Sequence, residues 1–196
     1  SREALFDDHC YRWVYGDSDG LPGLVIDRFG DVIVVQVSNA GIELLLEALL
    51  AAINELLPEL NILLKNDGKM RAIEGLDEYV RVAQGDVPKL VPLKENGVSF
   101  LVPVWDGQKT GWFYDHRLNR RRVQKLSAGK RVLDIFSYIG GWGIQAAAAG
   151  AKEVVCVDAS ASALDLVHQQ AQLNGVADKV HSLKGDAFAA MKQLHE

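Results

Sequence analysis

The stretch from Arg131 to Asp158, RVLDIFSYIGGWGIQAAAAGAKEVVCVD, decides the fold more than any other part of the sequence. Its run at 132–135 is apolar except for Asp134, as in a strand buried within a parallel sheet. A loop with two adjacent glycines follows, and then the segment 144–149, which is rich in alanine, the residue with the highest helix propensity. A second apolar run at 153–157 completes the order strand, loop, helix, strand. This order predicts a βαβ unit of an open α/β sheet.

Two carboxylates and a glycine loop predict a ligand site in this unit. Asp134 lies near the end of the first predicted strand. Asp158 closes the second, roughly 20 residues past the loop, where nucleotide-binding units place an acid for ribose hydroxyls. Gly140 and its neighbour let the backbone approach a ligand, and the helix start offers free N–H groups. Phe136 and Tyr138 stand where a dinucleotide loop has glycine, and their bulk leaves little room for a pyrophosphate. The predicted ligand is therefore an adenosine compound without phosphates, with S-adenosylmethionine the first choice; the alternative is a βαβ unit that binds nothing.

Composition limits the class of protein. The 196 residues suffice for one large domain or two small ones, and 48% hydrophobic and 24% charged residues are typical of a globular protein. The net charge of −5 gives no global attraction to nucleic acid, so any RNA contact needs a local basic patch. Cys10 and Cys156 lack metal-ligand spacing, and we predict no metal site and a reducing, cytoplasmic location. We expect no membrane partner, because no apolar run approaches transmembrane length.

Residues 1–104 are predicted to form a small α+β domain. The predicted elements are strands at 11–15, 24–26, 32–37 and 61–65, a helix at 41–57, a loop or short turn at 70–75, and a hairpin of 90–94 with 98–104. Asn96-Gly97 between two β runs is a strong hairpin signal. Asp17, Asp19 and Asp27 are assigned to polar turns, Asp27 in the turn of an earlier hairpin, rather than to a metal site, because calcium-loop spacing is absent.

Residues 105–196 are predicted to hold the first part of a Rossmann-like domain. Besides the central unit, the sequence predicts helices at 115–126, 160–173 and 187–196 and a strand at 179–183. Ser160 is placed to cap the second of these helices. Asp186 follows the third strand, as Asp134 and Asp158 follow the first two. Ligands of open α/β sheets bind at these strand ends, and three acids there suit a ligand with a cationic centre, an amine and several hydroxyls.

Several short motifs follow one another along nearly the whole chain. They are Asp19–Leu24, Asp27–Asp31, Gln108–Gly111, Phe113–Arg117, Asn119-Arg120, Phe136–Tyr138 and Gly140-Gly141. In this order they resemble the class I S-adenosylmethionine-dependent methyltransferases of large-subunit (23S) ribosomal RNA, bacterial enzymes that methylate cytosine C5 or, in a sister branch, guanine N7. The resemblance implies the N-terminal half of a class I methyltransferase domain, preceded by a small α+β domain that serves the RNA substrate.

The resemblance also implies which residues contact the cofactor. They are Phe113, Asp115 and Arg117 around the methionine part, Asp134, Phe136, Ser137, Tyr138 and Gly140 in the first cofactor motif, Asp158 at the ribose, and Asp186 near the adenine. The sequence departs from the family at Ile139, where threonine is usual, and at Trp142, where phenylalanine is common. The missing hydroxyl at Ile139 removes one polar contact that the family can make with its ligand.

Parts of the family's pattern are absent from this sequence. The family normally begins with an RNA-binding PUA domain, and it continues past the third strand with an Asp/Asn-Pro-Pro motif and, in cytosine C5 enzymes, a cysteine nucleophile. Neither Cys10 nor Cys156 stands in a suitable place. We therefore expect a fragment that is inactive alone, with its catalytic residues beyond Glu196. The open sheet edge at 132–135 would then favour self-association.

A basic run precedes the central strand. Arg120, Arg121, Arg122 and Lys125 lie on a predicted helix and are assigned to RNA phosphates. The alternative is a solvated helix face without a partner.

The sequence thus predicts an S-adenosylmethionine-dependent methyltransferase that acts on ribosomal RNA. One alternative is a module that holds the cofactor or RNA without turnover, which a longer sequence with the Pro-Pro motif would exclude. The other is a nicotinamide-dependent dehydrogenase, against which Phe136 and Tyr138 argue.

Overall fold

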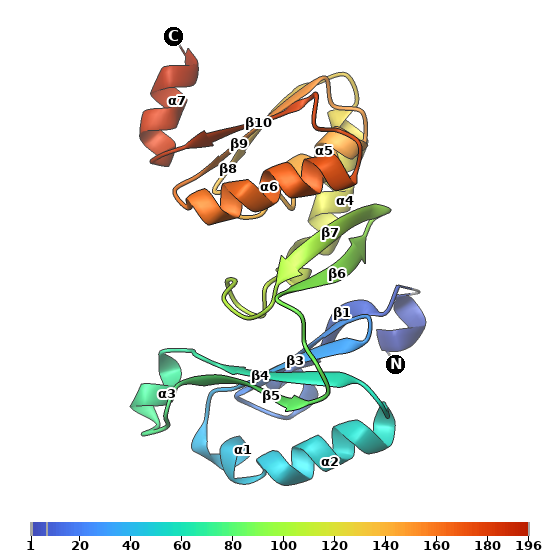
Figure 1. The fold of residues 1–196 in the computed structure, drawn as a ribbon, viewed down its shortest axis with the longest axis vertical. Helices are drawn as coiled ribbons and strands as arrows, with labels where there is room; N and C mark the ends of the chain where they lie inside the picture. The colour runs from blue at the N-terminus through green and yellow to red at the C-terminus, as the bar shows by residue number, and fades with distance from the viewer. Residues whose placement is uncertain (1, 7, 196) are drawn as a thin grey trace. The chain divides into compact units, whose positions relative to one another are not determined.

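The computed structural model describes residues 2–6 and 8–195. It divides into two compact units, one made of residues 1–93 with 102–114 and the other of residues 94–101 with 115–196. Figure 1 follows the chain from its blue N-terminal strands to the red helix at its C-terminal end. The division into domains at 1–104 and 105–196, which the sequence predicts, stays a prediction.

A five-stranded sheet forms the first unit. In spatial order its strands are β1 (Cys10–Tyr15), β2 (Leu24–Phe29), β3 (Val32–Val37), β4 (Asn61–Asn66) and β5 (Tyr79–Gln84). Only β3 and β4 are parallel neighbours; the other pairs are antiparallel. A parallel pair needs a crossover, which α1 (Ala40–Leu44) and α2 (Leu46–Leu56) supply, and Figure 1 shows α2 against one face of the sheet. The short elements are η1 (Arg2–Leu5), η2 (Gly16–Asp19) and α3 (Met70–Ile73).

The core of the first unit lies between this sheet and the crossover helices. Ile33 and Val35 of β3 are fully buried and belong to one cluster with Leu46 and Ile53 of α2. Residues seven apart share one face of a helix, so the leucine and isoleucine of α2 point to the same side. The β-branched run of β3 forms the strand that the sequence predicts, and the structure places it third of the five strands.

The hairpin predicted between the strands at 24–26 and 32–37 is present, but its turn begins after Phe29 and not at Asp27. Strand β2 continues to Phe29, and Asp27 lies within it, fully buried. Its carboxylate accepts bidentate hydrogen bonds from Arg12, with Oδ1 to Nε at 2.8 Å, and a further bond from the hydroxyl of Thr110 at 2.6 Å. A charge-paired aspartate can remain inside a strand because its polar atoms are satisfied there.

Other boundaries in the first unit also differ from the prediction. The helix predicted at 41–57 is interrupted at Leu45, which separates α1 from α2. The segment 70–75, predicted as a loop or short turn, contains the one-turn helix α3. Strand β5 was not predicted, because its side chains are only half-buried and the apolar alternation of an edge strand is weak.

The second unit is built on a parallel sheet with the order β10-β9-β8. The strands are β8 (Arg131–Ile135), β9 (Glu153–Asp158) and β10 (Val180–Lys184), and the helices are η3 (Tyr114–His116), α4 (Arg117–Ser127), α5 (Gly143–Ala148), α6 (Ala161–Leu173) and α7 (Ala187–His195). The hydroxyl of Ser160 accepts from the N–H of Ala163 at 3.2 Å, so the predicted cap of α6 is confirmed. The alternation of strands and helices is Rossmann-like, as predicted. In the described part of the chain, no helix is both long and apolar enough to cross a membrane.

Strands β6 (Leu90–Glu95) and β7 (Val98–Pro103) form a two-stranded sheet. The chain passes from the first unit to the second within β6 and returns within β7. The turn between these strands is Asn96-Gly97, and both residues have positive φ, 53° and 81°. The predicted hairpin is therefore confirmed, with the turn residues that such a backbone requires.

Gln170 of α6 and Asn174, the residue after this helix, bind strand β7 within the second unit. Gln170 accepts from the N–H of Leu101 at 2.9 Å and donates to its carbonyl at 2.7 Å. Asn174 makes the same pair of bonds with Ser99, at 3.0 and 2.7 Å. The amides take the place of a neighbouring strand and satisfy the free edge of β7.

Strand β8 is the edge of the parallel sheet. Among the described residues it pairs only with β9, and the side chain of Leu133 is 45% exposed. The open edge predicted at 132–135 is therefore present in this unit.

Candidate cofactor-binding site

The loop between β8 and α5 has an unusual backbone. Phe136 and Tyr138 have φ angles of 61° and 50°, in the left-handed region that favours glycine. Such strain in residues with a side chain is typical of functional loops. These two residues thus adopt the backbone of a glycine-rich loop, while the ring of Phe136, 76% exposed, adds an apolar surface.

Asp134 lies at the start of this loop and is 8% exposed. Its Oδ2 accepts a hydrogen bond from the backbone N–H of Gly143, the first residue of α5, at 2.8 Å. The pKa of this carboxyl is raised to about 6, chiefly by burial and also by the nearby charge of Asp158, against the lowering effects of the Gly143 bond and of Arg120. A proton can therefore bind Asp134 at mildly acidic pH.

Asp158 closes β9 and holds two backbone segments. Its Oδ2 accepts from the N–H of Tyr138 at 2.8 Å, and its Oδ1 accepts from the N–H of Ser160 at 2.9 Å. The side chain is only half-buried, and each carboxylate oxygen can accept more than one hydrogen bond. Asp158 can therefore fix the loop and still bind a pair of hydroxyl groups.

Ser137 and Gly140 are two further buried residues of this loop. The hydroxyl of Ser137 is buried and has no hydrogen-bond partner among the described residues. Gly140 has φ of 82°, and a Cβ there would lie 3.0 Å from Ile144 and 3.2 Å from Val167. The glycine is thus needed for both backbone conformation and packing.

Asp186 lies at the carboxyl end of β10, as predicted. Its Oδ1 accepts from the N–H groups of Phe188 and Ala189 at 3.0 and 3.2 Å, so it caps α7. The residue is exposed, and Oδ2 takes no part in these two bonds. A cap role and a ligand role are compatible for this carboxylate.

The three residues predicted around a methionine group divide between the units. Asp115 and Arg117 belong to the second unit; Asp115 is exposed, and its Oδ2 lies 3.8 Å from Nε2 of His116. Phe113 belongs to the first unit, where the ammonium of Lys109 lies 4.2 Å from the centre of its ring.

A pocket of about 350 Å³ adjoins the buried acid. Its lining is Val123, Val132, Leu133, Asp134, Ile135, Phe136 and Trp142. An apolar lining with one buried carboxyl is typical of sites for small ligands. The sequence predicted the acid and Phe136 as site residues but not Val123 of α4 or Trp142, the residue before α5.

The RNA role predicted for Arg120 is wrong. The side chain is 3% exposed, and its guanidinium donates to both carboxylate oxygens of Glu95, at 2.6 and 3.0 Å. A buried and paired guanidinium cannot contact a phosphate on a partner's surface. Arg121, Arg122 and Lys125 are exposed on the opposite side of α4 and remain available.

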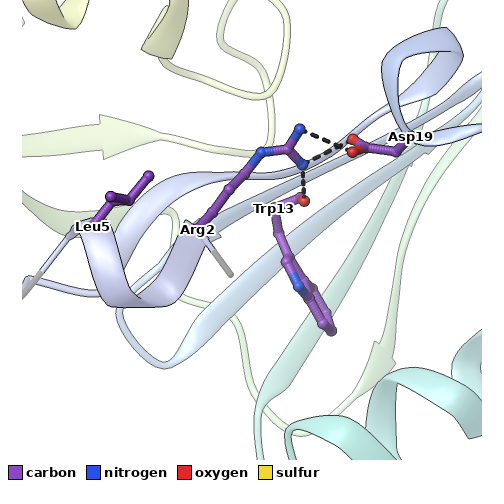
Figure 2. Close-up of a pocket in the computed structure, with 4 residues that line it drawn as sticks. All are labelled: Arg2, Leu5, Trp13 and Asp19. Carbon is purple, nitrogen blue, oxygen red and sulfur yellow. Dashed lines mark hydrogen bonds and ion pairs between the residues drawn. The ribbon is translucent and has the colours of Figure 1, made fainter.

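A second pocket lies in the first unit, and none of its lining residues is a predicted site residue. It has a volume of about 550 Å³ and is lined by Arg2, Leu5, Trp13 and Asp19. Figure 2 shows that the guanidinium of Arg2 reaches both Asp19, at 2.8 and 2.9 Å, and the carbonyl of Trp13. The bonds from Arg2 lower the pKa of Asp19. The polar groups of this pocket thus bind each other. Elsewhere too, no cluster of three or more potential metal ligands is present in residues 2–6 and 8–195.

Comparisons with known proteins address the identity of this fold and sequence. Residues 77–195 match a family model described as S-adenosylmethionine-dependent methyltransferase. The chain is 43% identical, over 95% of its length, to the ribosomal RNA large subunit methyltransferase I of Aeromonas salmonicida, of which it covers 48%. It is 39% identical over 98% of its length to the protein of the same name from Erwinia tasmaniensis, of which it covers 50%. The chain thus spans about half the length of the curated relatives it matches.

One solved structure is similar over almost the whole chain. It is described as a methyltransferase complexed with SAH, and it superposes with a TM-score of 0.87 at 25% identity. The match covers 99% of this chain and 51% of that one.

Proposed function

Because this chain belongs to the S-adenosylmethionine-dependent methyltransferases, we propose that its second unit binds S-adenosylmethionine and that the protein methylates a base of large-subunit ribosomal RNA. The observation that carries this proposal is the loop between β8 and α5, together with Asp134 and Asp158 at the ends of β8 and β9. It combines a buried acid, a glycine-like backbone at bulky residues, and a second acid that is half-buried at the loop's other side.

The residues of the loop fit this cofactor. The buried hydroxyl of Ser137 supplies a polar atom for a ligand, and a buried polar group in a native protein calls for a partner. The carboxylate of Asp158 suits the two hydroxyls of a ribose, because each of its oxygens keeps a lone pair free. The structure described as a complex with SAH has the same fold, which supports the choice of ligand.

The chain's own part in the reaction is binding and orientation. When bound, the cofactor supplies a methyl group made electrophilic by a sulfonium centre. The negative charge of Asp115 suits it to bind the ammonium group of the methionine part, and the positive charge of Arg117 suits it to bind the carboxylate group. Phe136 and Trp142 offer apolar surface that excludes water from the pocket beside Asp134. These side chains would hold the cofactor's methyl group in position for transfer, and such positioning can supply much of a rate enhancement.

Ribosomal RNA is the proposed substrate. The relatives from Aeromonas and Erwinia are named for ribosomal RNA of the large subunit. The exposed face of α4 with Arg121, Arg122 and Lys125 adds a local basic surface to a chain whose net charge is −5. The target base is proposed as cytosine C5 or guanine N7, in a cytoplasmic protein.

The test is transfer of a tritiated methyl group from S-adenosylmethionine to large-subunit ribosomal RNA. It is made with this chain and with the full reading frame that contains it. Labelled RNA with the full protein is the expected result, and loss of label in the Asp158→Ala variant links it to this site. Cofactor binding without any transfer would favour a non-catalytic binding module. Failure to bind the cofactor would overturn the proposal.

A further inference from the structure

A carboxylate outside the parallel sheet lies buried between its helices. Glu95, the last residue of β6, has no exposed surface. Its Oε1 and Oε2 accept from Nε and Nη2 of Arg120 on α4, at 2.6 and 3.0 Å. Its Oε1 also accepts from the amide of Gln145 on α5 at 2.9 Å, and Gln145 is fully buried as well. One side chain therefore joins three elements of the second unit.

The residue after Glu95 extends these contacts. The amide of Asn96 donates to Oε1 of Gln145 at 2.9 Å and to the carbonyl of Arg117 at 3.0 Å. The amide of Gln124 in turn donates to the carbonyl of Asn96 at 3.2 Å. The hairpin tip thus binds the first turn of α4 and the middle of α5 at once.

Both helices lead directly to predicted cofactor residues. Helix α4 begins at Arg117, two residues after Asp115. Helix α5 begins at Gly143, whose N–H binds Asp134. The guanidinium of Arg120 also lies 6.0 Å from the ring centre of Trp142, which lines the pocket beside that acid.

Stability alone does not account for a carboxylate in this place. A buried ion pair is often no more stabilising than apolar residues of the same volume, because both charges lose their hydration. A fully bonded polar network does, however, select one arrangement of the elements that it joins. What it fixes here is the separation between the starts of α4 and α5.

We propose that Glu95 is a positioning residue of the cofactor site: by binding Arg120 and Gln145, it holds the 115–117 segment at a fixed place relative to the loop that begins at Asp134. This inference rests on the proposed function, since it concerns the same site. It assigns to the hairpin tip a specific effect on the methionine part of the ligand. The ribose acid Asp158 lies outside the network, so binding of the adenosine part should not depend on Glu95.

Calorimetric titration of S-adenosylhomocysteine and of adenosine separates the two parts of the ligand. Wild type is titrated first, and absence of binding to either compound would overturn the proposed function and this inference together. With a wild type that binds, Glu95→Gln should weaken S-adenosylhomocysteine roughly tenfold and adenosine less than about twofold. The matched control is Glu153→Gln, which neutralises an exposed carboxylate paired with Arg131 at 2.7 Å and should change neither affinity.

A second variant covers the case in which Glu95→Gln does not fold, as judged by circular dichroism and thermal unfolding. Gln145→Met removes the two hydrogen bonds of α5, those with Glu95 and Asn96; Glu95 keeps Arg120, and Asn96 keeps the carbonyl of Arg117. This variant should show the same pattern: its affinity for S-adenosylhomocysteine should fall more than its affinity for adenosine. Equal losses for the two compounds, or no loss in a folded variant, would overturn the positioning role while leaving the proposed function in place.

Discussion

The backbone N–H of Gly143 donates a 2.8 Å hydrogen bond to Oδ2 of Asp134 and so joins the start of α5 to the end of β8. The helix approaches so closely that a Cβ at Gly143 would lie 2.6 Å from Sγ of Cys156 and 3.2 Å from the same Oδ2. Glycine at this position is therefore a requirement of the packing between the loop's helix and the sheet.

Gly143→Ala should destabilise the second unit by about 1–3 kcal/mol, because the added methyl group overpacks a tight contact. Urea unfolding measures this loss. Gly185→Ala is the control: a Cβ there meets no atom within 4 Å, and the change should stay below about 0.5 kcal/mol. Equal stability of the two variants would contradict the close approach of α5.

The raised pKa of Asp134 predicts a pH dependence of stability. The carboxyl has a pKa of about 6 in the folded chain against an ordinary value of 3.8, so the folded state binds more protons between these values. Its contribution to stability therefore falls as pH rises through this window and stays at the lower level above it. Between about pH 4 and about pH 7, the free energy of unfolding of wild type should fall by at most about 3 kcal/mol relative to that of Asp134→Asn. Urea unfolding of both proteins at several pH values tests this, and a constant difference would contradict it.

Much of the second unit could be predicted because its signals are local. Apolar runs gave the strands at 131–135 and 153–157 nearly to the residue, and Ser160 and Asn96-Gly97 marked a helix start and a hairpin turn. The family resemblance that the motifs predicted is confirmed by the family match. Short-range sequence patterns of this kind predict the structure correctly because the backbone geometry that they favour is the geometry found in the fold.

Burial of polar residues could not be predicted in the same way. The basic run places Arg120 beside exposed arginines, although it shares the inner face of α4 with Val123 and Ser127 at helical spacing. Its partner Glu95 is 25 residues away, and only the packed structure brings the two together. The one local signal for Gln145 was a lone polar residue in an alanine-rich helix.

The exposed face of α4 should contribute to RNA binding through phosphates. Replacing Arg121, Arg122 and Lys125 by alanine should weaken RNA binding and reduce the slope of log K against log salt by about 0.7–0.9 for each phosphate that is no longer neutralised. Filter binding at several salt concentrations measures the slope. A control triple variant, Lys152, Lys184 and Lys192 to alanine, removes the same charge elsewhere on the unit. An unchanged slope in the α4 variant would contradict the prediction and indicate that this face contacts solvent and not RNA.

The open edge of β8 should make this chain self-associate. A strand edge with an exposed leucine recruits other chains, and a charged side chain opposes such pairing. Light scattering should show species larger than a monomer for wild type and a shift toward monomer for Leu133→Lys. Leu173→Lys, at a leucine of similar exposure on α6, should not cause this shift. A monomeric wild type would contradict the prediction.

The most direct test of the account is calorimetric titration of S-adenosylhomocysteine into the wild-type chain and its Asp158→Ala variant. Wild type should bind one equivalent, and the variant, checked for folding, should bind about 10- to 150-fold more weakly because it cannot form charged hydrogen bonds to the ribose. The control Asp178→Ala removes an exposed acid outside the loop and should bind as wild type does. Equal affinities of wild type and Asp158→Ala, or no binding by wild type, would contradict the assignment of this loop as the cofactor site.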